Sequence, residues 1–206
     1  MDTLLLVACY ADFDAPALSA LTEALPSERR QRALRAKDPS ARAGTVLAYR
    51  LLAFGARSLL GRDDLPPVSV GKYGKPFFED GSLAFSISHS KDGVAVLLSK
   101  ASAAVGVDLE GIRALRPELI ERFSSASERR DIRTAEDAVA LWTRKEAVLK
   151  RTGLGLRGHL PEVDVSDTRS ILLSVGGVPS VLSVSPATVL KGDTVVRFLS
   201  PAELMQ

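Results

Sequence analysis

The chain of 206 residues has one cysteine, two histidines and few aromatic residues, and its charges almost cancel. A single cysteine excludes a disulfide framework within the chain, and two histidines are too few for a Cys/His zinc cluster. Aromatic residues make up 5% and the formal net charge is +2. The stacking surfaces and strong overall basic charge typical of a single-strand nucleic-acid binder are therefore missing, and any basic surface must be local.

Long apolar runs are missing as well. The run LLLVACY near the start is too short to span a membrane and lacks the basic residues of a signal peptide. It predicts a first β-strand instead. We therefore expect a cytoplasmic protein without membrane contact, long enough for one domain or two fused halves.

Periodicity along the chain predicts a mixture of helices and strands. Helical spacing predicts helices over residues 17–25, 45–60 and 135–152, the last being the longest, and short helices over residues 118–125 and 128–132. Strands are predicted at LAFSISHS, DGVAVLLSK and AAVGVDLEGI, whereas VSVGKYGKPFFEDG is mostly loop. After residue 161, VDVS, SILLSV, SVLSVS and TVVRFL predict one antiparallel sheet joined by Gly-Gly, Pro and Gly-Asp turns. This order favours an α+β fold with two similar halves, residues 1–100 and 101–206.

Two carboxylates lie on one face of the strand predicted at GVDLEGI. Side chains alternate between the faces of a strand, so Asp108 and Glu110 point away from Val107 and Leu109. Two carboxylates on one face suit a hard cation such as Mg²⁺. A half-buried strand with a polar solvent face explains the same pattern, so a third ligand is needed to favour the metal.

The longest predicted helix carries charges close to its apolar face. Glu146 shares a side with Leu149, Lys150 lies at its edge, and Lys145 also falls within the apolar arc. A surface pair between Glu146 and Lys150 with a snorkelling Lys145 is the simpler interpretation, but it explains only part of this pattern. Glu146 could instead complete a metal site with the two strand carboxylates, and Lys150 could hold a phosphate.

Two glycines end this helix. One of Gly153 and Gly155 is expected as the left-handed C-cap. The other would allow the backbone to approach a ligand or the neighbouring sheet, although packing alone also explains it.

Three further segments carry weaker signals. His89 lies between two serines at a strand end, where it is either structural or a donor to an anionic oxygen. The GKYGKP loop, with Lys72 and Lys75, lacks the spacing of a phosphate-binding loop but offers two cations. The basic run over residues 29–42 is either a solvated helix face or a site for a small polyphosphate or an acidic partner.

Four of these segments together resemble the 4'-phosphopantetheinyl transferases, specifically the larger two-half type related to the surfactin-synthetase activator. They are YGKP at 73–76, FSISHS at 85–90, GVDLE at 106–110 and WTRKEAVLKRTGLGL at 142–156. Their order and separations are those of the family, and the last segment fits W-x-x-K-E-A-x-x-K-x-x-G-x-G-L at every fixed position. Residues 27–42 match more loosely, and the last fifty residues match only in character.

The resemblance implies a fold and a reaction. The implied fold has two similar α/β halves related by a pseudo-twofold axis, each with a small antiparallel sheet packed on a long helix. The implied reaction moves 4'-phosphopantetheine from coenzyme A to a serine of an apo acyl, polyketide or peptidyl carrier protein and releases adenosine 3',5'-bisphosphate. Two fused halves make a complete site, which favours a monomer. This type often serves secondary metabolism, which favours a polyketide or peptidyl carrier.

The resemblance also implies roles for individual residues. The implied magnesium ligands are Asp108, Glu110 and Glu146. The residues expected at coenzyme A are Arg29, Arg32, Arg42, Lys75, Ser88, His89 and Lys150. Within this set the three arginines are expected at the 3'-phosphate, and Lys150 and His89 at the pyrophosphate. The residues expected to serve catalysis are Glu146, Lys150 and His89. From the chemistry of the transfer rather than from the resemblance, the first candidate for the base that accepts the serine proton is Glu146, directly or through a metal-bound water, and the second candidate is Glu128.

General chemistry agrees with this assignment, because phosphoryl transfer needs charge neutralisation and in-line positioning more than covalent help. Two other functions fit parts of the sequence. A Mg²⁺-dependent nuclease or phosphodiesterase would also use carboxylates and a lysine, although the D…E-x-K spacing is absent. A non-catalytic polyanion-binding module would use residues 29–42 and bind without Mg²⁺.

Overall fold

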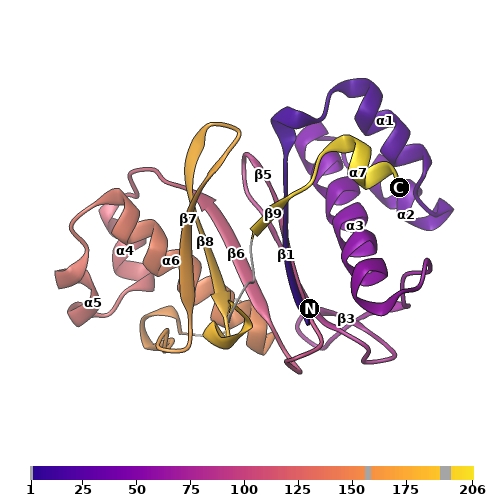
Figure 1. Ribbon diagram of the computed structural model, residues 1–206. Helices are drawn as coiled ribbons and strands as arrows, with labels where there is room; N and C mark the ends of the chain where they lie inside the picture. The colour runs from indigo at the N-terminus through magenta and orange to yellow at the C-terminus, as the bar shows by residue number, and fades with distance from the viewer. Residues whose placement is uncertain (1, 156–158, 191–195) are drawn as a thin grey trace.

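The computed structural model describes residues 2–155, 159–190 and 196–206. Two small sheets lie side by side in the middle of the molecule, and helices cover both ends (Figure 1). Within these residues, no helix has both the length and the apolar character needed to cross a membrane.

The first sheet forms around β1 (Thr3–Cys9), the strand predicted from LLLVACY. β1 pairs antiparallel with β5 (Gly93–Ser99), which in turn pairs antiparallel with β4 (Ala84–His89). Every residue of β1 and β5 is buried. Burial on both faces explains why these two strands are continuous apolar runs rather than alternating patterns.

The last strand, β9 (Val196–Phe198), joins this first sheet, where it pairs parallel with β1. The prediction that TVVRFL belongs to the C-terminal antiparallel sheet is therefore wrong for the part of it that the structure describes. The Gly-Asp turn predicted before it lies outside the described residues. Alternation of apolar residues predicts an extended segment, but it does not select the partner strand.

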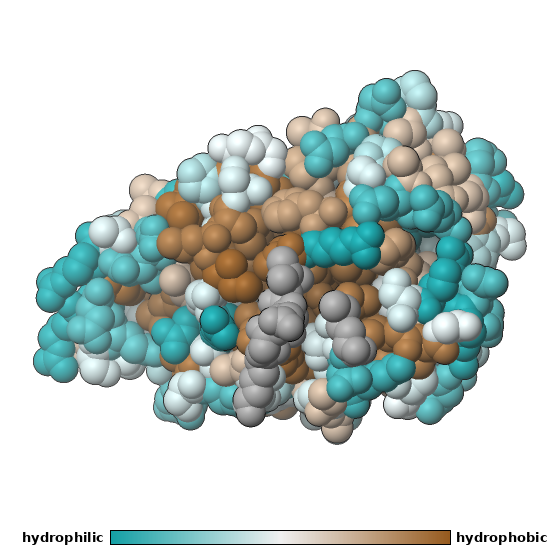
Figure 2. All heavy atoms as spheres, viewed as in Figure 1, coloured by the Kyte–Doolittle hydropathy of each residue, from teal (hydrophilic) through white to brown (hydrophobic). Residues whose placement is uncertain are grey.

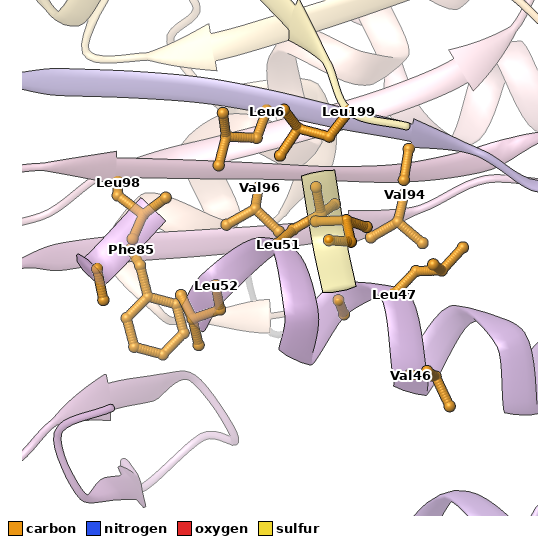
Figure 3. Packing of buried hydrophobic residues seen from close by; sticks show 14 of the residues in the cluster. Leu6, Val46, Leu47, Leu51, Leu52, Phe85, Val94, Val96, Leu98 and Leu199 are labelled. Atoms are coloured by element: carbon orange, nitrogen blue, oxygen red, sulfur yellow. The ribbon is translucent and has the colours of Figure 1, made fainter. Parts of the chain in front are cut away.

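Helices cover the outer face of the first sheet. They are α1 (Ala15–Glu23), α2 (Ser27–Leu34), α3 (Pro39–Leu60) and, at the end of the chain, α7 (Pro201–Met205). Leucines of α3 pack on the apolar side chains of β1 and β5 (Figure 3), namely Leu47, Leu51 and Leu52 against Leu6, Val94, Val96 and Leu98. Each fully buried leucine of this kind contributes about 1.5–3 kcal/mol.

α3 has 22 residues and α6 (Ala135–Thr152) has 18, so the prediction that the latter helix is the longest is wrong. α3 begins at residue 39 rather than 45. Asp38 accepts a hydrogen bond from Ala41 N at 2.8 Å, and Pro39 occupies the first turn. Both features start a helix, and they precede the apolar periodicity because residues 39–42 are exposed.

The second sheet has the order β6-β8-β7 and is antiparallel throughout. Its strands are β6 (Gly106–Gly111), β7 (Arg169–Val175) and β8 (Val178–Ser185). α6 packs on this sheet and has the bounds that the sequence predicted. A capping box of Thr134 and Asp137 begins α6, and Gly153 in the left-handed region ends it.

The VDVS segment, residues 163–166, is not a strand, contrary to the prediction. Asp164 accepts hydrogen bonds from Ser166 N at 2.9 Å and from Ser166 Oγ at 2.8 Å. Arg144 Nη2 donates to Val165 O at 2.9 Å. These side-chain bonds satisfy backbone groups that a strand would otherwise pair, and they favour a turn.

Shorter elements complete the two ends. α4 (Pro117–Phe123) and α5 (Ala126–Asp131) form close to the predicted positions. Figure 2 shows mostly hydrophilic side chains over their end of the molecule, whereas apolar side chains gather toward the middle. The loop-rich VSVGKYGKPFFEDG segment forms a small hairpin of β2 (Val68–Val70) and β3 (Pro76–Phe78).

The two sheets share a core. Leu5 and Val7 of β1 lie in one buried cluster with Val107 and Leu109 of β6. The layers therefore follow the order helix, sheet, sheet, helix (Figure 1), and the chain is α+β. The division into residues 1–100 and 101–206 stays a prediction, and β9 and α7 from the second part pack on the first sheet and its helices.

Candidate active site

A cavity of about 590 Å³ has walls from segments on both sides of residue 100 in the chain. Arg29 and Arg32 of α2 line it together with His89 of β4 and with Glu146 and Lys150 of α6. Its volume is typical of a site for a small molecule or cofactor. Residues predicted from separate segments of the sequence therefore meet in one cavity.

Lys150, Asp108 and Ser88 form a closed polar network beside this cavity. Lys150 Nζ lies 2.7 Å from Asp108 Oδ1 and 2.9 Å from Ser88 Oγ. Ser88 donates to the same Asp108 oxygen at 2.8 Å. Asp108 is 5% exposed and Ser88 is 1% exposed. Side chains alternate along β6, and Val107 lies in the core between the sheets. Asp108 therefore points to the opposite face, as the sequence predicted, and it reaches Lys150 of α6 there.

Glu146 lies beside this network. Glu146 Oε1 and Asp108 Oδ2 are buried and have no hydrogen-bond partner among the described residues. Burial, and next the negative charge of Asp108, raise the pKa of Glu146, while Lys150 acts against them. Lys150 forms its ion pair with Asp108, so the simpler prediction of a surface pair with Glu146 is not what the described residues show. These two buried oxygens without donors, one of them on the carboxyl group of raised pKa, can be satisfied by a proton or by a cation.

Glu110 has a different partner. Its Oε2 lies 2.8 Å from Arg113 Nη1 at the surface, although its charge also contributes to the raised pKa of Glu146. In the parts of the chain that the structure describes, no set of three or more His, Cys, Asp and Glu side chains is arranged to hold a metal ion. The structure thus groups Asp108 with Glu146, and the site of three carboxylates stays a prediction.

His89 packs against α3. Its Nε2 lies 3.2 Å from Gly44 O. A Cβ atom at residue 44 would lie 2.9 Å from His89 Cδ2 and 2.8 Å from the Tyr10 hydroxyl, so only glycine allows this approach. Burial is the main cause that lowers the pKa of His89; the hydrogen bond with Gly44 O acts against it and the charge of Lys150 adds to it, so the net effect favours the neutral imidazole. Gly44 precedes the helix predicted over residues 45–60, and only the earlier start of α3 places it inside a helix, so the sequence held no signal for this contact.

The predicted arginines divide into two groups. The Arg29 guanidinium lies 5.9 Å from the centre of the Tyr49 ring, and both side chains line the cavity together with Arg32. Arg42 Nη2 instead donates to Ala36 O at 3.1 Å, which ties the start of α3 to the end of α2.

Lys75 joins the β2–β3 hairpin to the end of α6 and to the segment before β6. Its Nζ donates to Arg151 O at 2.7 Å and to Val105 O at 3.1 Å. Burial, followed by the nearby Arg151, lowers the pKa of Lys75 to about 8. Lys75 lines the cavity with Gly153 and Gly155. Both glycines have positive φ, so each is needed for its backbone conformation, and residue 156 at the end of the motif lies outside the described residues.

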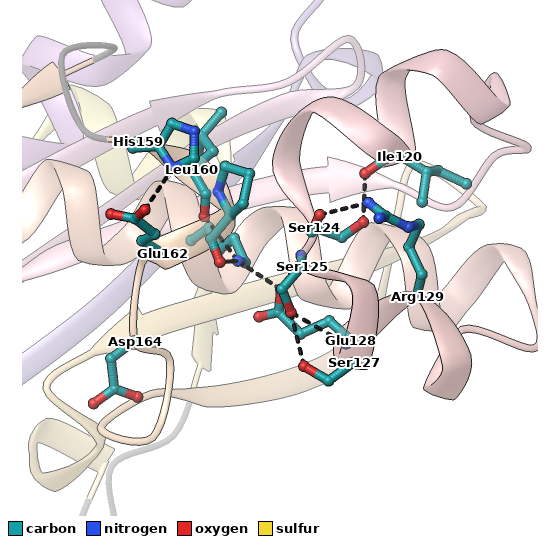
Figure 4. Close-up of polar contacts among 12 residues, drawn as sticks. Ile120, Ser124, Ser125, Ser127, Glu128, Arg129, His159, Leu160, Glu162 and Asp164 are labelled. Atoms are coloured by element: carbon teal, nitrogen blue, oxygen red, sulfur yellow. Dashed lines mark hydrogen bonds and ion pairs between the residues drawn. The ribbon is translucent and has the colours of Figure 1, made fainter.

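Lys145 and Glu128 form a second ion pair. Lys145 is 0% exposed, and its Nζ lies 2.9 Å from Glu128 Oε2 and 2.8 Å from Leu160 O. Figure 4 shows Glu128 beside Ser125, whose backbone N donates to the same Glu128 oxygen at 2.7 Å. Burial raises the pKa of Glu128, but the Ser125 and Lys145 bonds outweigh it and the net shift is downward. Lys145 therefore does not snorkel to solvent.

Sequence comparisons connect the chain to known proteins. The model of the 4'-phosphopantetheinyl transferase superfamily matches residues 104–186. The chain is 34% identical over 152 residues to the 4'-phosphopantetheinyl transferase AcpT of Salmonella typhimurium. The aligned residues cover 69% of this chain and 67% of AcpT. It is 35% identical over 96 residues to the 4'-phosphopantetheinyl transferase Sfp of Bacillus subtilis, covering 43% of this chain and 42% of Sfp. It is also 39% identical over 90 residues to the 4'-phosphopantetheinyl transferase psf-1 of Bacillus pumilus, covering 40% of this chain and 38% of psf-1.

Proposed function

Because this chain belongs to the 4'-phosphopantetheinyl transferase superfamily, we propose that it transfers the 4'-phosphopantetheine group of coenzyme A to a serine of an apo carrier protein. It is thus an enzyme, and adenosine 3',5'-bisphosphate is its second product. The observation that carries the proposal is the cavity in which Arg29 and Arg32 share walls with Glu146 and Lys150. Such a cavity offers cations for phosphates together with a carboxylate–lysine pair for the transfer itself.

The reaction exchanges one phosphorus–oxygen bond for another. The serine oxygen of the carrier bonds to the phosphorus that bears pantetheine, and the bond from that phosphorus to the bridging oxygen breaks. Adenosine 3',5'-bisphosphate leaves with the bridging oxygen, and the serine proton passes to Glu146. Lys150 offsets charge on the phosphates during this exchange.

Glu146 is the better candidate for the proton acceptor. In the site without a cation its pKa is raised and its Oε1 has no partner among the described residues, so the carboxylate is available to accept a proton. Glu128, the alternative, has its Oε2 occupied by Lys145 and Ser125, and its pKa is lowered. Both features make Glu128 a weaker base.

Coenzyme A would lie across the cavity. Arg29 and Arg32, which line it, are proposed to bind the 3'-phosphate, since a guanidinium can bind phosphate through two hydrogen bonds. Arg42 keeps one donor on Ala36 O and is proposed as a third arginine at the 3'-phosphate. Lys150 and His89 are proposed at the pyrophosphate, where an anion would raise the pKa of the imidazole, and Lys75 at the nucleotide.

Mg²⁺ is the proposed cofactor, and when bound it would neutralise charge on the pyrophosphate. The unpartnered oxygens of Asp108 and Glu146 fit a hard cation. Glu110 would act as the third ligand after leaving Arg113, with which it now pairs.

We also propose that the two halves are related by a pseudo-twofold axis. Each half contains a first strand, a long helix and then two paired strands, and in each sheet the last of these strands lies between the other two. A cavity between fused halves needs no second copy, which supports a monomer. We further propose a cytoplasmic location, a polyketide or peptidyl carrier as the preferred partner, and no role for nucleic acid or membrane.

The test is intact-protein mass spectrometry of apo carrier proteins after incubation with this protein, coenzyme A and Mg²⁺. A gain of one phosphopantetheine group that is lost with EDTA is expected, and peptidyl, polyketide and fatty-acid carriers tested in parallel would rank the partners. No gain on any carrier would contradict the proposal.

Two other outcomes would point to the alternative functions. Cleavage of a plasmid or RNA in Mg²⁺ would favour a nuclease. Salt-sensitive polyanion binding that ignores Mg²⁺ and survives Asp108→Ala would favour a binding module.

A further inference from the structure

The two sheets meet along β4 and β6, and this junction is called the seam. Two serine side chains of β4, rather than a ladder of backbone hydrogen bonds, join the two strands there. β4 and β6 are edge strands of their respective sheets and lie side by side. Val107 N donates to Ser86 Oγ at 3.1 Å, and Leu109 N donates to Ser88 Oγ at 3.2 Å. Since both serines lie on one face of β4, their spacing of two residues matches the spacing of the β6 donors.

These bonds matter because the groups they join are buried. Val107 and Leu109 are 0% exposed. A buried backbone N–H without an acceptor is costly, and an edge strand has no neighbouring ladder to supply one. Ser86 and Ser88 supply the missing acceptors, and this explains the alternating serines in FSISHS on structural grounds.

Ser88 makes two contacts that Ser86 does not share. Its hydroxyl donates to Asp108 Oδ1 at 2.8 Å and accepts from Lys150 Nζ at 2.9 Å. A hydroxyl has one hydrogen and two lone pairs. The bonds to Asp108, Lys150 and Leu109 N therefore use the full capacity of Ser88 Oγ.

We infer that Ser88 is a positioning residue, whose hydroxyl sets the Asp108 carboxylate and the Lys150 ammonium in place against the β6 backbone. One oxygen of Asp108 is held by Ser88 and Lys150, and the other is left for a further partner. The role differs from the direct coenzyme A contact that the sequence resemblance implies for Ser88. The benefit to catalysis rests on the proposed transferase function, whereas the positioning itself does not.

The experiment compares Ser88→Ala with Ser86→Ala, because each variant removes one seam acceptor and only the first touches Asp108 and Lys150. Both variants are expected to lower the thermal midpoint by a similar amount, about 3–8 °C. In carrier-modification kinetics with coenzyme A and Mg²⁺, Ser88→Ala is expected to lower kcat at least about tenfold at saturating coenzyme A. Ser86, unlike Ser88, is one of the residues that line the cavity, so Ser86→Ala can raise KM for coenzyme A, but its kcat at saturating coenzyme A is expected to change by no more than about twofold.

A readout without turnover tests the positioning directly. In ¹H–¹⁵N spectra of the free protein, the Lys150 ammonium signal, assigned by its loss in Lys150→Arg, is expected to shift and to exchange faster in Ser88→Ala but not in Ser86→Ala. An unchanged signal would overturn the inference. Equal kcat in the two variants, or a raised KM for coenzyme A with unchanged kcat in Ser88→Ala, would also overturn it, the latter in favour of a direct ligand contact. If the wild type modified no carrier, the proposed function would fail while the spectra still tested the positioning.

Discussion

Two lysines of α6 form ion pairs that differ in burial and in whether the polar atoms around them all have hydrogen-bond partners. The Lys145 ammonium is fully buried and lies within hydrogen-bond distance of Glu128 Oε2, Leu160 O and Pro161 O. The Lys150 side chain is 29% exposed and bonds to Asp108 and Ser88 at the cavity. Around Lys145 the three ammonium donors all have acceptors, whereas beside Lys150 one oxygen of Asp108 and one of Glu146 have no partner among the described residues.

The comparison distinguishes a structural ion pair from a binding site. A buried pair whose donors and acceptors are satisfied holds elements together, here α6, α5 and the segment at residues 160–162. Buried oxygens left without donors raise the free energy of the empty site, and a cation or a proton can recover it. Both lysines are charged and lie on the same helix. What distinguishes their surroundings is whether the neighbouring polar atoms have hydrogen-bond partners.

The largest expected effect is on transfer activity. Glu146→Gln keeps the shape of the side chain but removes the proton acceptor, so carrier modification is expected to slow by about 100- to 10,000-fold. Glu128→Gln, the matched change in the other pair, is expected to keep the rate per folded molecule within about tenfold. Initial rates followed by mass spectrometry measure both. A larger loss in Glu128→Gln than in Glu146→Gln would reverse the assignment of the base.

The same two variants should rank in the opposite order by loss of stability. Glu128→Gln leaves the buried Lys145 ammonium without its counter-charge, and the free energy of unfolding is expected to fall by about 2–4 kcal/mol. This is at the lower end for a broken buried pair, because the Glu128 side chain is 24% exposed. Glu146→Gln removes a buried charge beside Asp108 and is expected to change stability by no more than about 1 kcal/mol, in the stabilising direction. Urea unfolding in EDTA measures the two, and a strongly destabilised Glu146→Gln would contradict the interpretation.

The smallest expected effect is the pH dependence of the stability difference between each variant and the wild type, measured in EDTA. The pKa of Glu146 is raised above its ordinary value of 4.5, so the folded wild type retains a proton that the unfolded chain has lost. Wild-type stability is therefore expected to fall as pH rises from about 4.5 through the raised pKa, a loss absent from Glu146→Gln. The stability advantage of the variant over the wild type should therefore grow between pH 4 and 7.

The stability contribution of the Lys145–Glu128 pair should change with pH in the opposite direction. The pKa of Glu128 is lowered below 4.5, so its contribution is present above pH 4.5 and is lost as pH falls through the lowered value. The deficit of Glu128→Gln should therefore shrink on acidification. Thermal unfolding at several pH values measures both trends, and parallel curves for the two variants would contradict the distinction.

Local patterns were sufficient for much of the fold. The bounds of α6 follow from its capping residues, its apolar period and Gly153, all within a few residues of one another. The direction of Asp108 followed from strand alternation, and its grouping with Glu146 was predicted from the motifs, whereas its ion pair with Lys150 was not predicted. Each of these predictions needed only short-range geometry or a recognised spacing.

Long-range choices could not be predicted in the same way. The partner of β9, the acceptor of Lys145 and the seam bonds of Ser86 and Ser88 join residues far apart in the chain. Apolar alternation or a single charge does not specify a distant partner, because many partners satisfy the same local pattern. The contact between Gly44 and His89 belongs to the same class, since it depends on how α3 crosses β4.

By itself, the sequence determined the α+β class, the order of most helices and strands, and the residues that carry charge near the apolar face of α6. These properties arise from backbone propensity and side-chain period, which act within a few residues. The tertiary structure alone decided that Lys145 is enclosed in a structural pair with Glu128, whereas the motif had already placed Lys150 at the site. That outcome depends on the supply of hydrogen-bond partners from other elements, and folding determines this supply only when those elements pack together.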